Sequence, residues 1–146
     1  MFYYVIISIV AMMLAQISKL FTKYWFTREW DYSAMFATGG MPSSHTALVT
    51  ALATSIGLIE GFETTSFAIT FVFGMVIAHD SMGIRFEAGK HASVINKIAD
   101  DLSELLDQPE NPEEKLKDLL GHHPIEVIGG FLLGIIVALV GFYFFI

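Results

Sequence analysis

The sequence predicts an all-α fold: a small integral membrane bundle of about four transmembrane or near-transmembrane helices, with short interfacial helices between two of them. Two observations predict this class. The chain is 54% hydrophobic with a mean hydropathy of +0.60, which is more apolar than a typical soluble domain. Charged residues are also absent from residues 2–18, 46–59, 64–78 and 127–146. The length of 146 residues suits one membrane domain, 1–146.

The uncharged runs predict membrane segments at about 2–20, 44–60, 64–80 and 124–146. A membrane-spanning helix needs about 20 mostly apolar residues, with a lower limit near 17. The last run meets this length, the first and third are close to the limit, and the second is short. The first run follows no basic region and exceeds the roughly 7–15 apolar residues of a signal peptide, so we expect a retained helix rather than a cleaved signal.

The connection at about 86–120 predicts two interfacial helices. From His91 to Asp107, apolar residues recur at helical spacing, and acidic residues fill much of the opposite face. Two prolines interrupt this pattern, after which residues 113–120 can form a second short helix. These helices fit an interfacial or solvated cover, although a surface that senses a partner or a lipid would show the same pattern.

The last membrane segment carries small residues at helical spacing: Gly130, Gly134, Ala138 and Gly141. Small residues let membrane helices approach closely. The pattern therefore predicts tight helix packing, either within the chain or in a homodimer.

The charge distribution predicts an orientation. All eight basic residues follow the first or the third segment, whereas the turn between the second and third carries only acidic charge. Four crossings place the basic connections on one side, which the positive-inside rule makes cytoplasmic, with both termini outside. A phosphate site there would recruit Lys and Arg too. The net charge of −7 argues against a nucleic-acid partner, and the lack of cysteine excludes disulfides and thiolate chemistry.

Two segments at membrane boundaries carry histidine, and the first reads Gly39-Gly40-Met41-Pro42-Ser43-Ser44-His45. Proline and serine before an apolar run predict a helix N-terminus, whose N–H groups and positive dipole end can bind an anion. The paired glycines let the backbone bend close to a ligand, and the histidine falls in the first turn. A capped helix with an interfacial histidine is the structural alternative.

The second segment reads His122-His123-Pro124-Ile125-Glu126-Val127. Glu126 follows His122 by four positions, so a helical turn would place both side chains on one face. A carboxylate that accepts a hydrogen bond from one ring N–H fixes the tautomer and leaves the other nitrogen as a nucleophile. A hydrogen-bonded pair that only caps the last helix is the alternative.

Three further charged residues flank the same boundary. Arg85 follows the third segment, and its guanidinium suits bidentate phosphate binding. Asp80 could orient Arg85 or cap the third helix. Lys19 ends the first segment and can supply a point charge, or it could snorkel as a flanking residue.

The run from His122 to Gly134 resembles the last signature of the type 2 phosphatidic acid phosphatase superfamily, which also contains acid phosphatases and vanadium-dependent haloperoxidases. In that signature a nucleophilic histidine precedes an aspartate by four positions. Pro42-Ser43-Ser44-His45 is similar to the Pro-Ser-Gly-His signature, and Arg85 to the arginine of the Ser-Arg element. The resemblance covers about residues 15–140 and indicates a divergent branch.

This resemblance implies a membrane phosphatase that uses no metal or other cofactor. His122 would attack phosphorus, Glu126 would orient His122, and His45 would protonate the leaving oxygen and then activate water. The bilayer setting favours a phospholipid or polyprenyl phosphate as substrate.

By the same resemblance, Lys19, Arg85, Ser43 and Ser44 would neutralise the phosphate oxygens, with Asp80, Gly39 and Gly40 in support.

The chain departs from the superfamily at several positions. Ser44 replaces a glycine, Ile84 replaces the serine before the arginine, and 36 residues rather than five separate Arg85 from His122. The lysine-and-arginine-proline signature is absent, with Lys19 and Arg28 as partial substitutes.

His91 has the five-residue gap from Arg85, but Ile95 stands where the carboxylate should be, so we favour His122. Two other functions stay open. A distorted phosphate pocket could bind or transport phosphorylated lipids without turnover. His79, Asp80 and the remaining histidines could instead hold a metal, but no compact ligand motif is present.

Overall fold

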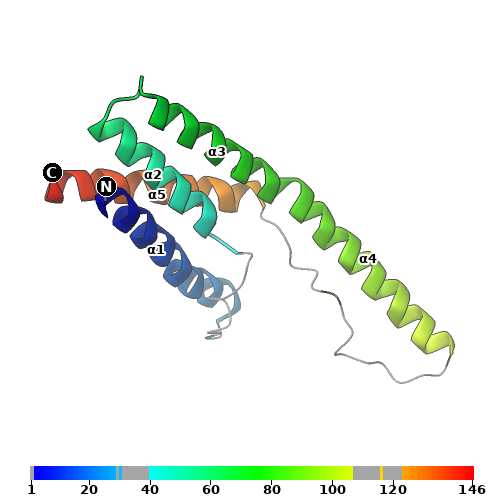
Figure 1. Cartoon of the computed structure of the whole chain (residues 1–146). Helices are drawn as coiled ribbons and strands as arrows, with labels where there is room; N and C mark the ends of the chain where they lie inside the picture. Colours follow the sequence, from blue (N-terminus) through cyan, green and yellow to red (C-terminus); the bar gives the residue numbers. More distant parts are fainter. Residues whose placement is uncertain (1, 29, 31–39, 107–115, 117–122) are drawn as a thin grey trace.

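The computed structural model describes residues 2–28, 30, 40–106, 116 and 123–146, without the side chains of residues 26, 84–86 and 104. Five α-helices lie in this part of the chain: α1 (Phe2–Thr27), α2 (Ser44–Ile59), α3 (Thr65–Met82), α4 (Ile84–Leu105) and α5 (Pro124–Phe145). Helices α1, α2, α3 and α5 pack side by side as a bundle, whereas α4 projects away from it (Figure 1). The predicted all-α membrane bundle is confirmed.

Three helical stretches are long and apolar enough to cross a membrane: Phe2–Trp25, Thr65–Ser103 and Pro124–Phe145. Helix α2 has only 16 residues and spans about 24 Å at about 1.5 Å per residue, less than a hydrocarbon core of about 30 Å. Its short length is tolerated because it packs against α1, α3 and α5, which surround it within the bundle. Helix α1 extends beyond the predicted boundary at 20 and ends where Arg28 adopts a φ of 60°.

Small side chains form the core of the bundle. The buried cluster contains mostly alanine and branched aliphatic residues from α1, α2 and α5, namely Ile7, Ala11, Ala15, Ala47, Ala51, Val137 and Ala138. The predicted small-residue face of α5 takes part in this packing. A Cβ at Gly134 would lie 2.6 Å from the Ala47 carbonyl oxygen, and one at Gly141 would overlap the Ile7 side chain. This face therefore contacts α1 and α2 of the same chain; a homodimer stays a prediction.

Helix α3 lies on the outside of the bundle. Thr64 caps its N-terminus by accepting from the Phe67 N–H at 3.3 Å, and Ser81 is its one buried residue. At Gly83 the direction changes only slightly, and α4 continues outward (Figure 1).

The connection after α3 differs from the predicted pair of short helices. Helix α4 begins at Ile84, earlier than the predicted start at His91, because Gly83 does not end the helical path. Apart from Leu116, the predicted helix at 113–120 lies outside the described residues. The Asn96 side chain accepts from the Leu116 N–H at 2.9 Å and donates to the Leu116 carbonyl at 2.8 Å, so the returning chain is fastened to α4 at this point.

Candidate functional site

The N-terminus of α2 is built as the sequence predicts. Ser43 is the N-cap, and its hydroxyl accepts from the Thr46 N–H at 3.4 Å and from the Thr46 hydroxyl at 3.0 Å. Ser43 and Ser44 are buried, while His45 in the first turn is exposed. The helix dipole and first-turn N–H groups therefore point toward the same end of the bundle as the accessible His45 side chain.

The first turn of α5 lies directly against this N-terminus. His123 is the N-cap, Pro124 occupies the first turn, and Glu126 follows within that turn. The Ser43 N–H donates to the Glu126 carbonyl oxygen at 2.9 Å. This backbone hydrogen bond brings together two motifs that are 83 positions apart in the chain (126 minus 43).

Two glycines permit this approach of α5 to α2. A Cβ at Gly130 would overlap the Ser43 carbonyl oxygen and lie 3.1 Å from the Thr46 Cβ, so only glycine fits without displacement. At the neighbouring Gly129, a Cβ would meet the flexible end of Met41 at 3.2 Å. The spacing of glycines in the last helix thus sets the geometry of the candidate site.

Lys19 joins the same place from α1. Its side chain is 2% exposed, so it does not snorkel toward solvent from a lipid-facing flank. Glu126 is near enough for the two charges to interact. Gly40 has a φ of 96°, and a Cβ there would lie 3.8 Å from the Lys19 Cδ. A buried ammonium next to a carboxylate and a helix N-terminus is a natural position for an anionic ligand.

Two residues near Lys19 were not predicted from the sequence. Thr22 lies three positions after Lys19, and its hydroxyl donates to the Met41 carbonyl at 2.7 Å, which ties α1 to the loop before α2. Gln16 lies three positions before Lys19, and its buried Oε1 atom has no hydrogen-bond partner among the described residues. The available signal was helical spacing, because residues three apart share a face with Lys19.

The remaining predicted residues are placed in part. Asp80 lies in the last turns of α3, and Arg85 lies in the first turn of α4, although its side chain is not described. His122 and Gly39 lie outside the described residues. Helix α5 begins at Pro124 with His123 as its N-cap, and the predicted pairing of His122 with Glu126 stays a prediction because His122 lies outside the described residues.

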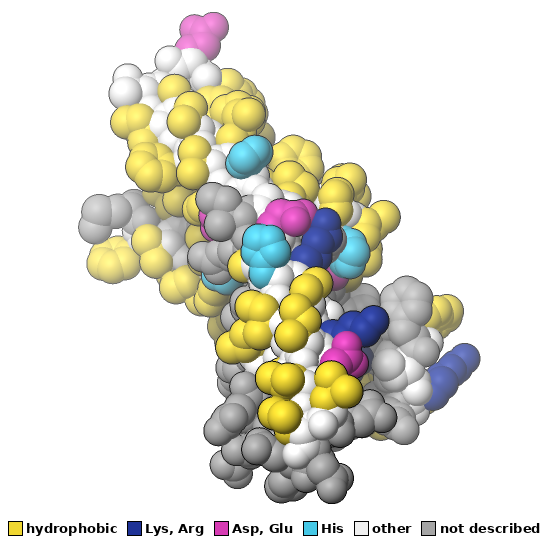
Figure 2. Space-filling model, turned by 90° about the vertical axis from the view of Figure 1, so that its right-hand side faces the viewer, with side chains coloured by type: hydrophobic (Ala, Val, Ile, Leu, Met, Phe, Trp, Pro, Cys, Tyr) yellow, Lys and Arg dark blue, Asp and Glu magenta, His cyan; other side chains and the backbone are white. Residues whose placement is uncertain are grey.

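Charged and histidine side chains gather on one face of the molecule (Figure 2). Figure 2 shows histidine, acidic and basic side chains close together near the middle of one face, with hydrophobic side chains above and below them. Within the described part of the chain, no group of three or more His, Cys, Asp or Glu side chains could hold a metal ion. The described part of the candidate site contains the Lys19 cation, the Glu126 carboxylate and the N-terminus of α2.

The fold and this site define a small helical membrane protein with a polar site at one end of its bundle. Residues 3–137 match the divergent PAP2 family, and the chain belongs to that family. This membership confirms the resemblance to the type 2 phosphatidic acid phosphatases. The chain is also 40% identical over 146 aligned residues to the uncharacterized membrane protein YuiD of Bacillus subtilis (strain 168), which covers 94% of this chain and 92% of that protein. No solved structure matched the chain.

Proposed function

We propose that the protein hydrolyses lipid phosphates in the membrane through a phosphohistidine, without a metal ion. The observation that carries this proposal is the hydrogen bond from the Ser43 N–H to the Glu126 carbonyl. It holds the α2 N-terminus, with His45, against the first turn of α5, with Glu126, and the buried Lys19 lies beside them. Family membership supports the same chemistry.

In the proposed reaction, a His122 ring nitrogen attacks phosphorus and the bond to the lipid oxygen breaks. The Glu126 carboxylate accepts a hydrogen bond from the N–H of the other ring nitrogen, which keeps its proton, and stabilises the positive charge that the imidazole gains on attack. His45 gives a proton to the departing lipid alkoxide and later removes one from water, which attacks the phosphohistidine and releases inorganic phosphate. Attack and hydrolysis restore both histidines to their starting protonation states.

Positive charge and N–H groups would stabilise the equatorial oxygens during both transfers. Lys19 and Arg85 supply the charge, and the first turn of α2 supplies the dipole end. In this proposal Ser43 positions the helix and does not bind the phosphate, in contrast to the role that the sequence predicted for it. Its N–H, its carbonyl and its hydroxyl all take part in hydrogen bonds within the fold, so it positions the α2 N-terminus, while Ser44 and the residues after it lie next to the phosphate.

The test is phosphate release from a panel of lipid phosphates by the protein in bilayer nanodiscs, with and without a strong chelator. We expect phosphate release that the chelator leaves unchanged. Phosphate bound to the wild-type protein should survive a basic quench and be lost in an acid quench, as expected for phosphohistidine. His122→Ala should carry no such phosphate. Turnover by His122→Ala equal to that of the wild type would contradict the assigned nucleophile.

A second candidate is a protein that binds or transports phosphorylated lipids without turnover. Ser44 favours it, because this residue is 3% exposed and carries a side chain where the resemblance expects glycine. Saturable lipid-phosphate binding with no phosphate release across the panel would support this candidate, and Ser44→Gly would then be the variant to test for restored turnover.

The proposed orientation places the site on the cytoplasmic side. Lys23 lies near the site end of α1, and Glu63 lies in the turn at the opposite end, between α2 and α3. Because the chain has no cysteine, Lys23→Cys and Glu63→Cys each introduce a single thiol. In intact cells, a membrane-impermeant maleimide should label the Glu63→Cys variant and not the Lys23→Cys variant. The opposite result would show that the site lies on the outer side.

A further inference from the structure

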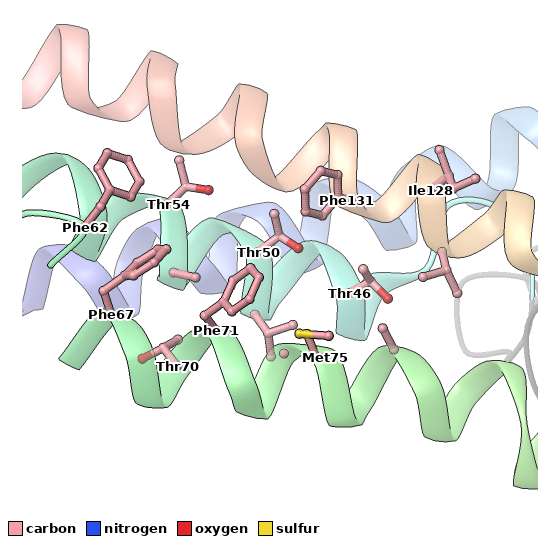
Figure 3. A pocket seen from close by; sticks show the side chains of 15 residues that line it. Thr46, Thr50, Thr54, Phe62, Phe67, Thr70, Phe71, Met75, Ile128 and Phe131 are labelled. Carbon is pink, nitrogen blue, oxygen red and sulfur yellow. The ribbon is translucent and has the colours of Figure 1, made fainter. Parts of the chain in front are cut away.

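An apolar groove runs along the bundle between α3 and the α2–α5 pair. Its volume is about 390 Å³, within the usual range for a ligand pocket. Phe67, Phe71 and Met75 reach into it from α3, and Phe131 reaches in from α5 (Figure 3). The polar groups on its wall are threonine hydroxyls, and one of these, on Thr70, donates to its own helix at 2.8 Å. Such a lining suits hydrocarbon.

The groove begins at the candidate site. Thr46 and Val127 both line it from the first turns of α2 and α5, and the Thr46 hydroxyl donates to the hydroxyl of the N-cap Ser43 at 3.0 Å. A ligand with its polar end at the α2 N-terminus could therefore extend into the groove without turning back on itself.

The length of the groove matches one leaflet of a bilayer. Its α3 wall runs from Phe67 to Ala78, an advance of about 16 Å at about 1.5 Å per residue. Half of a hydrocarbon core is roughly 15 Å thick. Because α3 is long and apolar enough to cross a membrane and exposes most of its side chains, we expect the groove along it to lie at hydrocarbon depth.

Aromatic rings close the end farthest from the site. The Phe62 ring packs edge-on against Phe67 at a centroid distance of 5.1 Å, and Phe67 stacks on Phe71 at 5.8 Å. Phe62 also lies over Gly57, where a Cβ would meet its Cδ1 at 2.6 Å. The groove is therefore long enough for one chain of leaflet length, and the rings of Phe62 and Phe67 lie at its far end.

We propose that this groove holds one hydrocarbon chain of a membrane lipid whose polar end occupies the site beside His45 and Glu126. The phosphate identity of that polar end rests on the proposed function; the chain-binding role of the groove does not. The groove has the length of one leaflet, so the preferred substrate has at least one chain long enough to reach the Phe62 ring at its far end.

Two measurements in bilayer nanodiscs test this proposal. The first is photolabelling with a hexadecyl phosphate that carries a terminal diazirine, mapped by mass spectrometry. The second is the ratio of kcat/KM for hexadecyl phosphate to that for butyl phosphate. The blocking variant is Gly74→Leu, since a Cβ at Gly74 lies 3.6 Å from Val49 and the longer side chain extends into the groove. The control is Val76→Leu, on the exposed side of α3.

We expect saturable label on residues 62–75 of the wild type, displaced by unlabelled hexadecyl phosphate. Gly74→Leu should lower both the label and the hexadecyl-to-butyl ratio by roughly tenfold, whereas Val76→Leu should change neither. Phe62→Ala, in the exposed turn, should shift the preference toward longer chains and provides a readout that does not depend on crowding the helix packing.

The outcomes separate the two proposals. Saturable groove labelling without phosphate release from any lipid would refute the phosphatase and support the groove. Phosphate release with an unchanged hexadecyl-to-butyl ratio in Gly74→Leu, and label spread evenly around the bundle, would refute the groove alone. Photocrosslinks between copies through α3 would also refute it, because the groove would then be a subunit contact.

Discussion

Gly130→Ala is the substitution that most directly tests how the site is assembled. The added Cβ would overlap the Ser43 carbonyl oxygen, which is backbone and cannot rotate away. Overpacking of this kind costs about 1–3 kcal/mol. Alanine also favours the helix over glycine by up to about 1 kcal/mol, which would mask part of the cost in a single measurement.

Gly129→Ala removes that uncertainty because it makes the same change one residue away. Its Cβ would meet the Cε of Met41 at 3.2 Å and the Cβ of Pro42 at 3.4 Å, contacts that small side-chain movements relieve. The helix-propensity gain is common to both variants and cancels in their difference. We therefore expect Gly130→Ala to be less stable than Gly129→Ala by about 1–3 kcal/mol in reversible unfolding from mixed micelles.

The same substitution should reduce activity more than stability predicts. Displacing Ser43 lengthens its hydrogen bond to Glu126, and a shift of about 1 Å in a site can lower the rate about 100-fold. Gly134→Ala is the matched control, since its Cβ would also clash with α2 backbone, 2.6 Å from the Ala47 oxygen, but about one turn farther from the site. It should lose stability while its folded fraction keeps its kcat/KM.

Equal stability of the Gly129 and Gly130 variants would refute the inference that α2 and α5 are in backbone contact at Ser43. Equal loss of kcat/KM in the Gly130 and Gly134 variants would refute the separate inference that this contact positions the site.

Three more predictions follow from individual contacts. Lys19→Met keeps an unbranched buried side chain but removes the charge, so kcat/KM for lipid phosphates should fall about 100- to 1,000-fold; a fall of less than twofold would place Lys19 outside the site. Thr22→Val removes the 2.7 Å bond to the Met41 carbonyl and should lower the unfolding free energy by about 1 kcal/mol in the same micelle assay; an unchanged value would show that this bond adds nothing net. Asn96→Ala removes both bonds to Leu116, so the Leu116 N–H should exchange with deuterium roughly 3- to 10-fold faster, and an unchanged rate would contradict the fastening of the chain to α4.

The helix N-terminus, the membrane segments and the close-packed face of α5 depend on local sequence, so they could be predicted. The proline and serines before residue 45 predicted the α2 N-terminus, and Ser43 caps it. The uncharged stretches predicted α1, α3 and α5, since only apolar residues can cover a helix in lipid. The small residues of α5 predicted close packing, and Gly130 and Gly134 contact α2 backbone.

The features that depend on tertiary contact could not be predicted in the same way. Charge near Lys19 suggested the end of a membrane segment, yet α1 continues to Thr27, and the bundle buries this lysine next to Glu126. The hydrogen bond between Ser43 and Glu126 depends on how closely two helices approach, and no local pattern encodes it. The proposed roles of His122 and Arg85 stay predictions, because the structure does not describe their side chains.

The contrast between α2 and α3 has a consequence for how this sequence can change over evolutionary time. Helix α3 has one buried residue, and its large apolar side chains face outward, so selection acts mainly on their hydrophobicity. Drift among Val, Ile, Phe and Met should be nearly neutral there, outside the groove. Helix α2 has nine buried residues, most of them small, so a larger side chain at most of its positions would separate the helices. Homologues should therefore differ freely along the part of α3 outside the groove and hardly at all along the inner faces of α2 and α5.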